Sequence, residues 1–372
     1  MQQSEFDITC TLAELIRCKD LVSTNQCLST LLFDDIAEQA IKHGVAALIY
    51  QQWLNFTEMP DTDLSLWANV DKQLNIIHRF LAPETERVFS ALQTNNIGFV
   101  VLKGFALSEQ VYQQPHVRPR TDIDIIIDPI SSDLLIAVFN DLGFNNPRGW
   151  QPKTIIDQYS FTKTIAKGIK LNFDVHLKIS NDKALQDLIT YEELTAAVSL
   201  KFKNSTQLID KPHALIHAVI HLLHHRINGD LIKLIWFYDI WLLVENLTEE
   251  ECVVLTNLIT DKGLSALFVE VLTVTNSYFS AEKIQLLITS LEKVEANPLF
   301  NYLLAEPSLL AMMWHNFTTN KGARAKIDYI RETAFPPKQE LYLKYGADSQ
   351  WPLFLLYIRR IITGAFKWIT SR

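Results

Sequence analysis

Cysteines, long apolar runs and targeting segments are scarce or missing in this sequence. Its cysteines (Cys10, Cys18, Cys27 and Cys252) form no C-x-x-C pair and have no histidine at zinc-finger spacing, so we expect free thiols in a reducing compartment. No run of about 18 uncharged apolar residues occurs, which predicts no transmembrane helix. The first residues lack the basic and apolar segments of a secretory signal. We expect a cytoplasmic protein without a membrane partner.

The sequence also lacks an excess of positive charge. It carries 34 Lys and Arg against 42 Asp and Glu, a formal net charge of −8. This balance argues against broad affinity for nucleic acid, and no DNA partner is expected. A local cationic patch around Lys103, Arg118 and Arg120 remains compatible with the overall charge.

The pattern of apolar residues predicts an α+β fold. With 372 residues, of which 48% are hydrophobic, the chain is long enough for two or three domains with a buried core. Apolar residues at helical spacing predict a helical N-terminal region, 1–82, and a helical C-terminal region, 183–372, without strands after Asp182. Between them, region 83–182 mixes short β-branched runs with helical ones, which predicts a small mixed sheet.

Several elements of the middle region can be placed from local signals. Pro83 is expected to begin a helix that runs to Leu92. Strands are predicted over 97–102, around 122–127, and over 160–166 and 170–178, the last two joined by a hairpin turn at Lys167-Gly168. Further on, Thr248-Glu-Glu-Glu251 predicts a capped helix start.

Three carboxylates stand out in the predicted sheet. Asp122 and Asp124 are two residues apart, so in a strand they project to one face while the neighbouring isoleucines face the core. Asp174 falls on the polar side of an alternating strand, where a small sheet can bring it beside the first two. Solvated carboxylates on an edge strand are the simpler alternative. Converging acids repel one another unless a cation lies between them, which favours a Mg²⁺ or Mn²⁺ site.

The cationic residues near this strand are candidates for binding phosphate. Lys103-Gly104 follows the predicted strand over 97–102, and Gly104 allows close approach of backbone to a ligand at the start of a predicted helix. Of Arg118 and Arg120, one could hold a triphosphate and the other could pair with Asp122 or Asp128. A solvated lysine at a strand end is the alternative for Lys103.

A histidine stripe marks the helix predicted to begin near Pro212. His213, His217, His221 and His224 are spaced four, four and three residues apart and share one face. A dedicated zinc site is disfavoured because no glutamate of the H-E-x-x-H type accompanies them. Hydrogen bonding and contact with nucleotide or acceptor are the preferred roles, with Asp239 on the next helix as a possible partner. Trp236 and Trp241, on the same helix as Asp239, are expected to belong to the core.

The segment from Leu353 to Ile369 combines apolar residues with Arg359, Arg360 and Lys367. An amphipathic basic helix of this kind can lie on a membrane surface, but a terminal helix that docks on its own protein is commoner, and we expect the latter.

These sequence blocks resemble the uncharacterised nucleotidyltransferase family of the DNA polymerase β-like nucleotidyltransferase superfamily. The resemblance covers about residues 30 to 270. In chain order it rests on Leu102-Lys-Gly104 with Leu107 and Tyr112, Arg118-Pro with Thr121-Asp-Ile-Asp124, Phe173-Asp-Val-His176, and His221 with Asp239. It implies a small mixed-sheet nucleotidyltransferase core flanked by helical regions.

The resemblance implies transfer of a nucleoside monophosphate from a nucleoside triphosphate to an unknown acceptor, with release of pyrophosphate by a two-metal mechanism. It makes Asp122, Asp124 and Asp174 the catalytic residues and the ligands of Mg²⁺ or Mn²⁺. The nucleotide-binding residues it implies are Lys103, Gly104, Arg118, Arg120, His176 and His221. The acceptor is left open as a small molecule, a peptide, a protein or an RNA end.

Two alternatives remain at this point. The wider superfamily has a glycine-serine pair where this chain has Lys103-Gly104, so the protein could instead be a catalytically inactive module that binds nucleotide or a partner. A metal phosphohydrolase built on the histidine stripe ranks last, because the sequence has no adjacent His-Asp pair.

Overall fold

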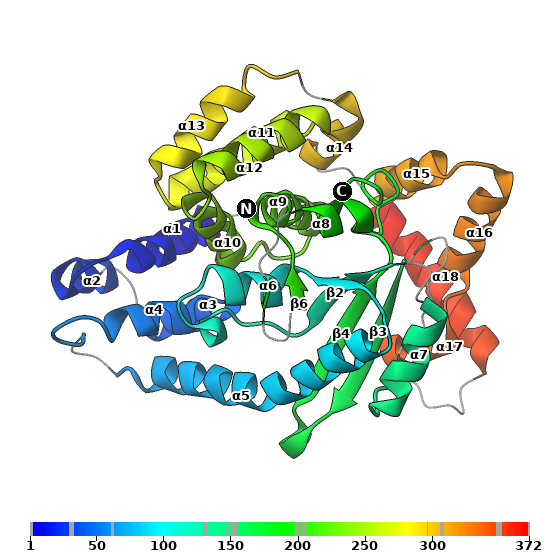
Figure 1. Ribbon diagram of the computed structural model, residues 1–372, viewed down its shortest axis with the longest axis horizontal. Coiled ribbons are helices and arrows are strands. Elements are labelled where there is room, and N and C mark those ends of the chain that lie inside the picture. The colour runs from blue at the N-terminus through cyan, green and yellow to red at the C-terminus, as the bar shows by residue number, and fades with distance from the viewer. Residues whose placement is uncertain are drawn as a thin grey trace. The chain divides into compact units, whose positions relative to one another are not determined.

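The computed structural model (Figure 1) describes residues 3–29, 33–60, 63–128, 132–147, 149, 155, 157–197, 201–202, 206–295, 297–305, 309–346 and 352–370. The chain folds into two compact units, each assembled from three separate segments. Unit 1 comprises Met1–Pro83, Lys103–Arg120 and Lys211–Pro298; unit 2 comprises Glu84–Leu102, Thr121–Asp210 and Leu299–Arg372. The division into consecutive regions 1–82, 83–182 and 183–372 stays a prediction.

Unit 1 is helical throughout its described part. Its helices are α1 (Gln3–Arg17), α2 (Leu21–Leu28), α3 (Phe33–Lys42), α4 (Ala46–Trp53), α6 (Lys103–Gln110), α9 (Lys211–Ile227), α10 (Leu234–Glu245), α11 (Glu249–Asp261), α12 (Ser265–Tyr278) and α13 (Glu282–Leu291), with a 3-10 turn, η1 (Pro115–Val117). Helix α9 packs against α6, α10, α11 and α12 (Figure 1). Leu215, Ile240 and Leu272 on these helices are fully buried. Their burial follows from the helical spacing of apolar residues in the sequence.

Helix α5 (Ser65–Thr94) begins in unit 1 and continues into unit 2, and it corrects one prediction. The sequence predicts that a helix begins at Pro83, but Pro83 lies inside α5. An internal proline removes one backbone hydrogen bond and costs about 3 kcal/mol. The helix continues past it because buried apolar residues such as Val88 and Leu92 follow, and their packing outweighs that cost.

The described part of unit 2 contains a six-stranded mixed sheet in the order β3-β4-β2-β1-β6-β5. The strands are β1 (Phe99–Val101), β2 (Ile123–Ile127), β3 (Gln158–Thr164), β4 (Lys170–His176), β5 (Lys201–Phe202) and β6 (Thr206–Leu208). The pairs β2–β4 and β1–β6 are parallel, and the other neighbours are antiparallel. The small mixed sheet of the predicted α+β fold is confirmed. The prediction that no strand follows Asp182 is wrong, since β5 and β6 both lie after it. These two strands are too short to show an alternating pattern in the sequence, and so the pattern did not reveal them.

One face of the sheet carries the core of unit 2. Phe161 of β3 and Phe173 of β4 both contact Phe139, and the rings of Phe139 and Phe161 are stacked with centroids 4.1 Å apart. Phe89, in the last turns of α5, meets Phe173 edge-on at 6.1 Å. The isoleucines that alternate along β2, with Ile123 opposite Phe173, extend the same apolar face. The other face of β2 and β4 is therefore the one that presents Asp124 and Asp174.

The remaining helices of unit 2 are α7 (Ser132–Asp141), α8 (Tyr191–Ala196), α14 (Asn301–Leu304), α15 (Leu309–Thr319), α16 (Ala323–Ala334), α17 (Lys338–Tyr345) and α18 (Leu353–Thr370), with 3-10 turns η3 (Ala166–Gly168) and η5 (Pro298–Phe300), the latter beginning at the last residue of unit 1. Helix α18 packs against α16 and α17, and Tyr357 Oη donates to the carbonyl of Pro336 at 2.9 Å. The expected docking of the terminal helix on its own protein is confirmed by these contacts.

None of the helices that the structure describes is long and apolar enough to span a membrane.

Candidate functional site

Asp124 and Asp174 lie side by side on the polar face of the sheet in unit 2. Strands β2 and β4 are parallel neighbours, and their register pairs these two residues. Residues paired in this way project to the same face from strands about 4.8 Å apart. Asp122 directly precedes Ile123, the first residue of β2. The strand alternation in the sequence thus predicted the meeting of Asp124 with Asp174.

Each of the two carboxylates is held by a hydrogen-bonding side chain. His176 Nε2 lies 2.8 Å from Asp124 Oδ1. Ser160 Oγ, on the neighbouring strand β3, donates to Asp174 Oδ1 at 2.7 Å. The sequence assigned His176 to nucleotide binding, whereas its contact here is with a carboxylate. Ser160 was missed; the signal that could have found it is the hairpin register, which places Ser160 opposite Asp174.

The donor chemistry of this pair suits a hard divalent cation. Carboxylate oxygens are the ligands that Mg²⁺ and Mn²⁺ prefer, and hydrogen bonds to such carboxylates commonly fix their orientation. Over the described residues, no group of three or more His, Cys, Asp or Glu side chains is gathered tightly enough to hold a metal ion. Asp124 and Asp174 therefore fit such an ion as a pair, and the three-carboxylate site that includes Asp122 stays a prediction.

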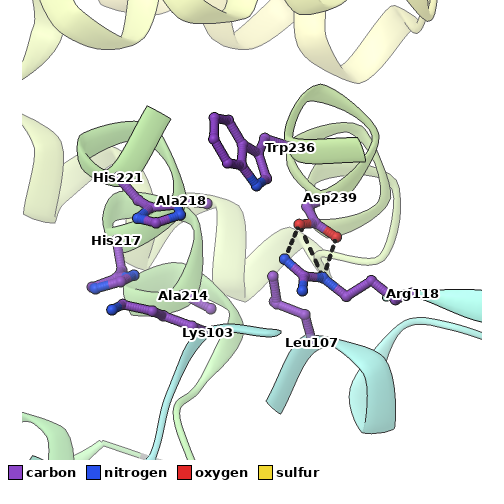
Figure 2. A pocket seen from close by; sticks show the side chains of 9 residues that line it. All are labelled: Lys103, Leu107, Arg118, Ala214, His217, Ala218, His221, Trp236 and Asp239. Atoms are coloured by element: carbon purple, nitrogen blue, oxygen red, sulfur yellow. Dashed lines mark hydrogen bonds and ion pairs between the residues drawn. The ribbon is translucent and has the colours of Figure 1, made fainter. Parts of the chain in front are cut away.

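Unit 1 contains a pocket of a different character, between α6, α9 and α10. Figure 2 shows the residues that line it: Lys103, Leu107, Arg118, Ala214, His217, Ala218, His221, Trp236 and Asp239. Residues that the sequence singled out are thus brought together: Lys103, Leu107, Arg118, His217, His221 and Asp239. Trp236 also lines the pocket, although the sequence favoured a place in the core for it.

Asp239 is the anchor of one wall of this pocket. Arg118 donates to it from Nε, at 3.1 and 3.2 Å, and from Nη2, at 2.7 Å (Figure 2). Tyr112 Oη donates to the same carboxylate at 2.6 Å, and burial together with the Asp239 charge raises the pKa of Tyr112. From the sequence, the histidines were expected as partners of Asp239. One of the two arginines was expected to pair with either Asp122 or Asp128. The structure instead pairs Arg118 with Asp239, 121 residues away along the chain, and local sequence patterns do not reveal a contact of that range.

Gly104 makes room for this arginine. A Cβ at Gly104 would overlap Nη1 of Arg118 and lie 3.1 Å from its Cζ. The glycine is therefore needed for close approach, as the sequence predicts, but within unit 1 the group that approaches is a guanidinium. Lys103, the first residue of α6, has a φ of 47°, which is unusual for a residue with a side chain. Backbone strain of this kind gathers at functional sites.

Arg120 lies outside the pocket lining. Its Nη1 donates to Ser108 Oγ at 3.0 Å, its Nη2 lies 2.9 Å from His78 Nδ1, and its guanidinium stands over the ring of Phe105. Burial lowers the pKa of Arg120 to about 10. Arg120 thus contacts two residues of α6, Phe105 and Ser108. A role for Arg120 in nucleotide binding stays a prediction.

The histidine stripe of α9 divides into two parts. His213 and His217 are buried, whereas His221 is partly exposed. The rings of His217 and His221 lie 6.2 Å apart, and His221 meets Trp236 edge-on at 5.3 Å. The stripe thus supplies two rings to the pocket wall.

A family model described as an uncharacterised nucleotidyltransferase matches residues 30–280. No curated protein matches. The matched range contains both the carboxylate pair of unit 2 and every residue that lines the pocket of unit 1.

Proposed function

The chain belongs to the uncharacterised nucleotidyltransferase family, and we propose that it transfers a nucleoside monophosphate from a nucleoside triphosphate to an acceptor. The acceptor nucleophile forms a bond to the α-phosphorus, the bond from that phosphorus to the oxygen bridging to the β-phosphate breaks, and pyrophosphate leaves. The proton of the nucleophile passes to a carboxylate. The observation that carries this proposal is the pairing of Asp124 with Asp174 across β2 and β4.

Asp124 and Asp174, together with Asp122, would hold Mg²⁺ or Mn²⁺. When bound, such ions stabilise negative charge on the entering and leaving oxygens. Asp174 accepts the proton of the nucleophile, because it is the more exposed of the two residues and so the more accessible to an acceptor. His176 and Ser160 keep the two carboxylates in position through the hydrogen bonds described above.

The cationic side chains of unit 1 bind the phosphates in this proposal. Lys103 donates to a phosphate oxygen, and His221 adds a ring N–H. Arg118 donates hydrogen bonds from Nε and Nη2 to Asp239, so in this proposal its main role is to form the pocket wall and not to bind the ligand. The acceptor and the base of the nucleotide stay open.

Isotope transfer tests the proposed reaction directly. The full chain is incubated with Mg²⁺, a cell extract and each nucleoside triphosphate in turn, labelled either at the α- or at the γ-phosphate. We expect label from the α-phosphate, and not from the γ-phosphate, to become attached to an acceptor. Asp124→Asn should abolish transfer, and Asp133→Asn, an exposed acid on α7 in the same unit, should leave it unchanged. Acceptor labelling by γ-phosphate, or activity that survives Asp124→Asn, would contradict the proposal.

One structural observation adds to the altered glycine motif in favour of a catalytically inactive binding module. His176 Nε2 lies 2.8 Å from Asp124 Oδ1, so one oxygen of this carboxylate is already engaged. In that case the chain binds a nucleoside triphosphate, but no acceptor in any extract becomes labelled and no pyrophosphate appears.

A further inference from the structure

The polar side chains that line the pocket of unit 1 are, with one exception, hydrogen-bond donors. Lys103, Arg118, His217, His221 and Trp236 all carry N–H groups, and the other lining residues except Asp239 are apolar. Figure 2 shows the indole nitrogen of Trp236 turned into the space between His221 and Asp239, and the end of the Lys103 side chain beside the His217 ring. A lining of this composition suits a ligand rich in acceptor oxygens.

The one acid in the lining does not reverse this preference. Both oxygens of Asp239 accept hydrogen bonds from Arg118, and one of them also accepts from Tyr112. The charges of Asp239 and Arg118 therefore compensate each other. Among the lining residues, Lys103 is a second cationic side chain against one carboxylate, a composition that favours an anionic ligand.

The space in the pocket comes from small residues on α9. Ala214 and Ala218 are four residues apart, as are His217 and His221, so the four side chains share one face of the helix. Methyl groups at two of these positions leave room in front of the two rings. Lys103, the first residue of α6, also lines the pocket and has a positive φ.

We infer that this pocket is an oxyanion site for a phosphate group that binds without a divalent metal. All of its lining residues belong to unit 1. The inference rests on the proposed function only in assigning the phosphate to a substrate or product of nucleotidyl transfer. Pyrophosphate is used as the probe because it is the proposed product and is a small, strongly charged anion.

Calorimetric titration of the full chain with pyrophosphate, in buffer containing EDTA, tests the inference. We expect measurable binding that weakens about tenfold or more in Lys103→Met, which removes a charged donor. Trp236→Phe removes the indole N–H and part of the ring system but keeps an aromatic ring beside His225, and it should weaken binding about fivefold. The matched controls are Lys42→Met, an exposed lysine at the end of α3, and Trp241→Phe, a tryptophan of α10 outside the lining. Both controls should bind as the unaltered chain does.

The outcomes separate this inference from the proposed function. Binding that requires Mg²⁺, or that is equal in the lining variants and their controls, overturns the pocket as an oxyanion site, even if nucleotidyl transfer is found. Binding that persists in Asp124→Asn, while transfer is lost, supports both proposals. Metal-free binding without transfer to any acceptor supports the pocket and contradicts the proposed function.

A competition experiment identifies the source of the phosphate. If pyrophosphate displaces a bound nucleoside triphosphate, the pocket holds the phosphate tail of the nucleotide. If glycerol phosphate binds in the presence of the triphosphate and weakens in Lys103→Met, the pocket holds a phosphorylated acceptor. Either result supports an oxyanion site, and failure of both anions to bind overturns it.

Discussion

Asp124 and Asp174 occupy matched positions on two parallel strands, and each has one carboxylate oxygen held by a neighbouring donor. Two acids in such proximity are stable only if a donor or a cation offsets their repulsion. In this chain the donors are His176 and Ser160, and an ion is the proposed addition. Substitutions of these carboxylates and of the side chains that hold them therefore test the proposed function most directly.

Replacing Asp174 by asparagine separates proton acceptance from nucleotide binding. Asp174→Asn keeps the size of the side chain and its contact with Ser160, but it removes the base and weakens one proposed metal ligand. We expect turnover to fall by about two to four orders of magnitude while the affinity for nucleoside triphosphate stays the same. Transfer kinetics and equilibrium dialysis measure the two quantities, with Asp133→Asn as the control. Unchanged turnover would contradict the role of Asp174.

Ser160 tests whether the orientation of a carboxylate affects metal affinity. Ser160→Ala removes the donor to Asp174 Oδ1, and we expect the affinity for Mn²⁺ to fall about tenfold to a hundredfold. Ser160→Thr keeps the hydroxyl and should restore most of the affinity. Titration followed by electron paramagnetic resonance reports bound Mn²⁺ independently of activity. Equal affinities in the alanine and threonine variants would show that the hydroxyl has no such role.

The Arg118–Asp239 pair should make a large contribution to the stability of unit 1. Their side chains are 10% and 3% exposed, so removing one partner leaves a charge in a poorly solvated place. We expect Asp239→Asn to lower the free energy of unfolding by about 3–5 kcal/mol. Tyr112→Phe removes a single hydrogen bond to the same carboxylate and should cost about 0.5–1.5 kcal/mol. Urea unfolding measures both, and similar losses in the two variants would argue against a buried ion pair.

Gly104 should be coupled energetically to Arg118. In Gly104→Ala the added methyl group overlaps the guanidinium, which Asp239 prevents from moving away, and we expect a loss of about 1–3 kcal/mol. In an Arg118→Met background the flexible thioether can yield, so the same alanine should cost much less. A double-mutant cycle measured by urea unfolding gives the coupling. Additive effects would mean that the two residues do not meet as the structure shows.

Cys27 should react slowly with alkylating agents above neutral pH. Burial is the main cause, followed by the nearby thiol of Cys18 at 3.9 Å, and together they raise the pKa of Cys27 from 9.0 to about 12. The thiolate is the reactive form, so at pH 9 the native chain should carry about five-hundredfold less of it than the unfolded chain. Mass spectrometry of iodoacetamide adducts, with the chain in urea as the reference, measures the difference. Equal rates in the native and unfolded chains would contradict the raised pKa.

Local patterns in the sequence predicted those parts of the structure that depend on neighbouring residues. The alternation along β4 located Asp174 on the polar face, and Thr248 forms the expected capping box with Glu251. The partners of Asp239 were not predicted, because Arg118 and Tyr112 lie 121 and 127 residues away along the chain. Nothing in the composition of α10 marks which of its aromatic residues borders a pocket, so Trp236 was assigned to the core.

The parallel pairing of β2 with β4 also bears on how this protein folds. The contact between His176 and Asp124 closes a loop of 52 residues, and β3 must form its hairpin with β4 on the way. Contacts of such long range form slowly and late, since the chain loses much conformational freedom before they stabilise it. An ion that needs both carboxylates therefore gains its site only in the nearly native chain. Added Mg²⁺ would slow unfolding by mass action and leave the rate of refolding almost unchanged.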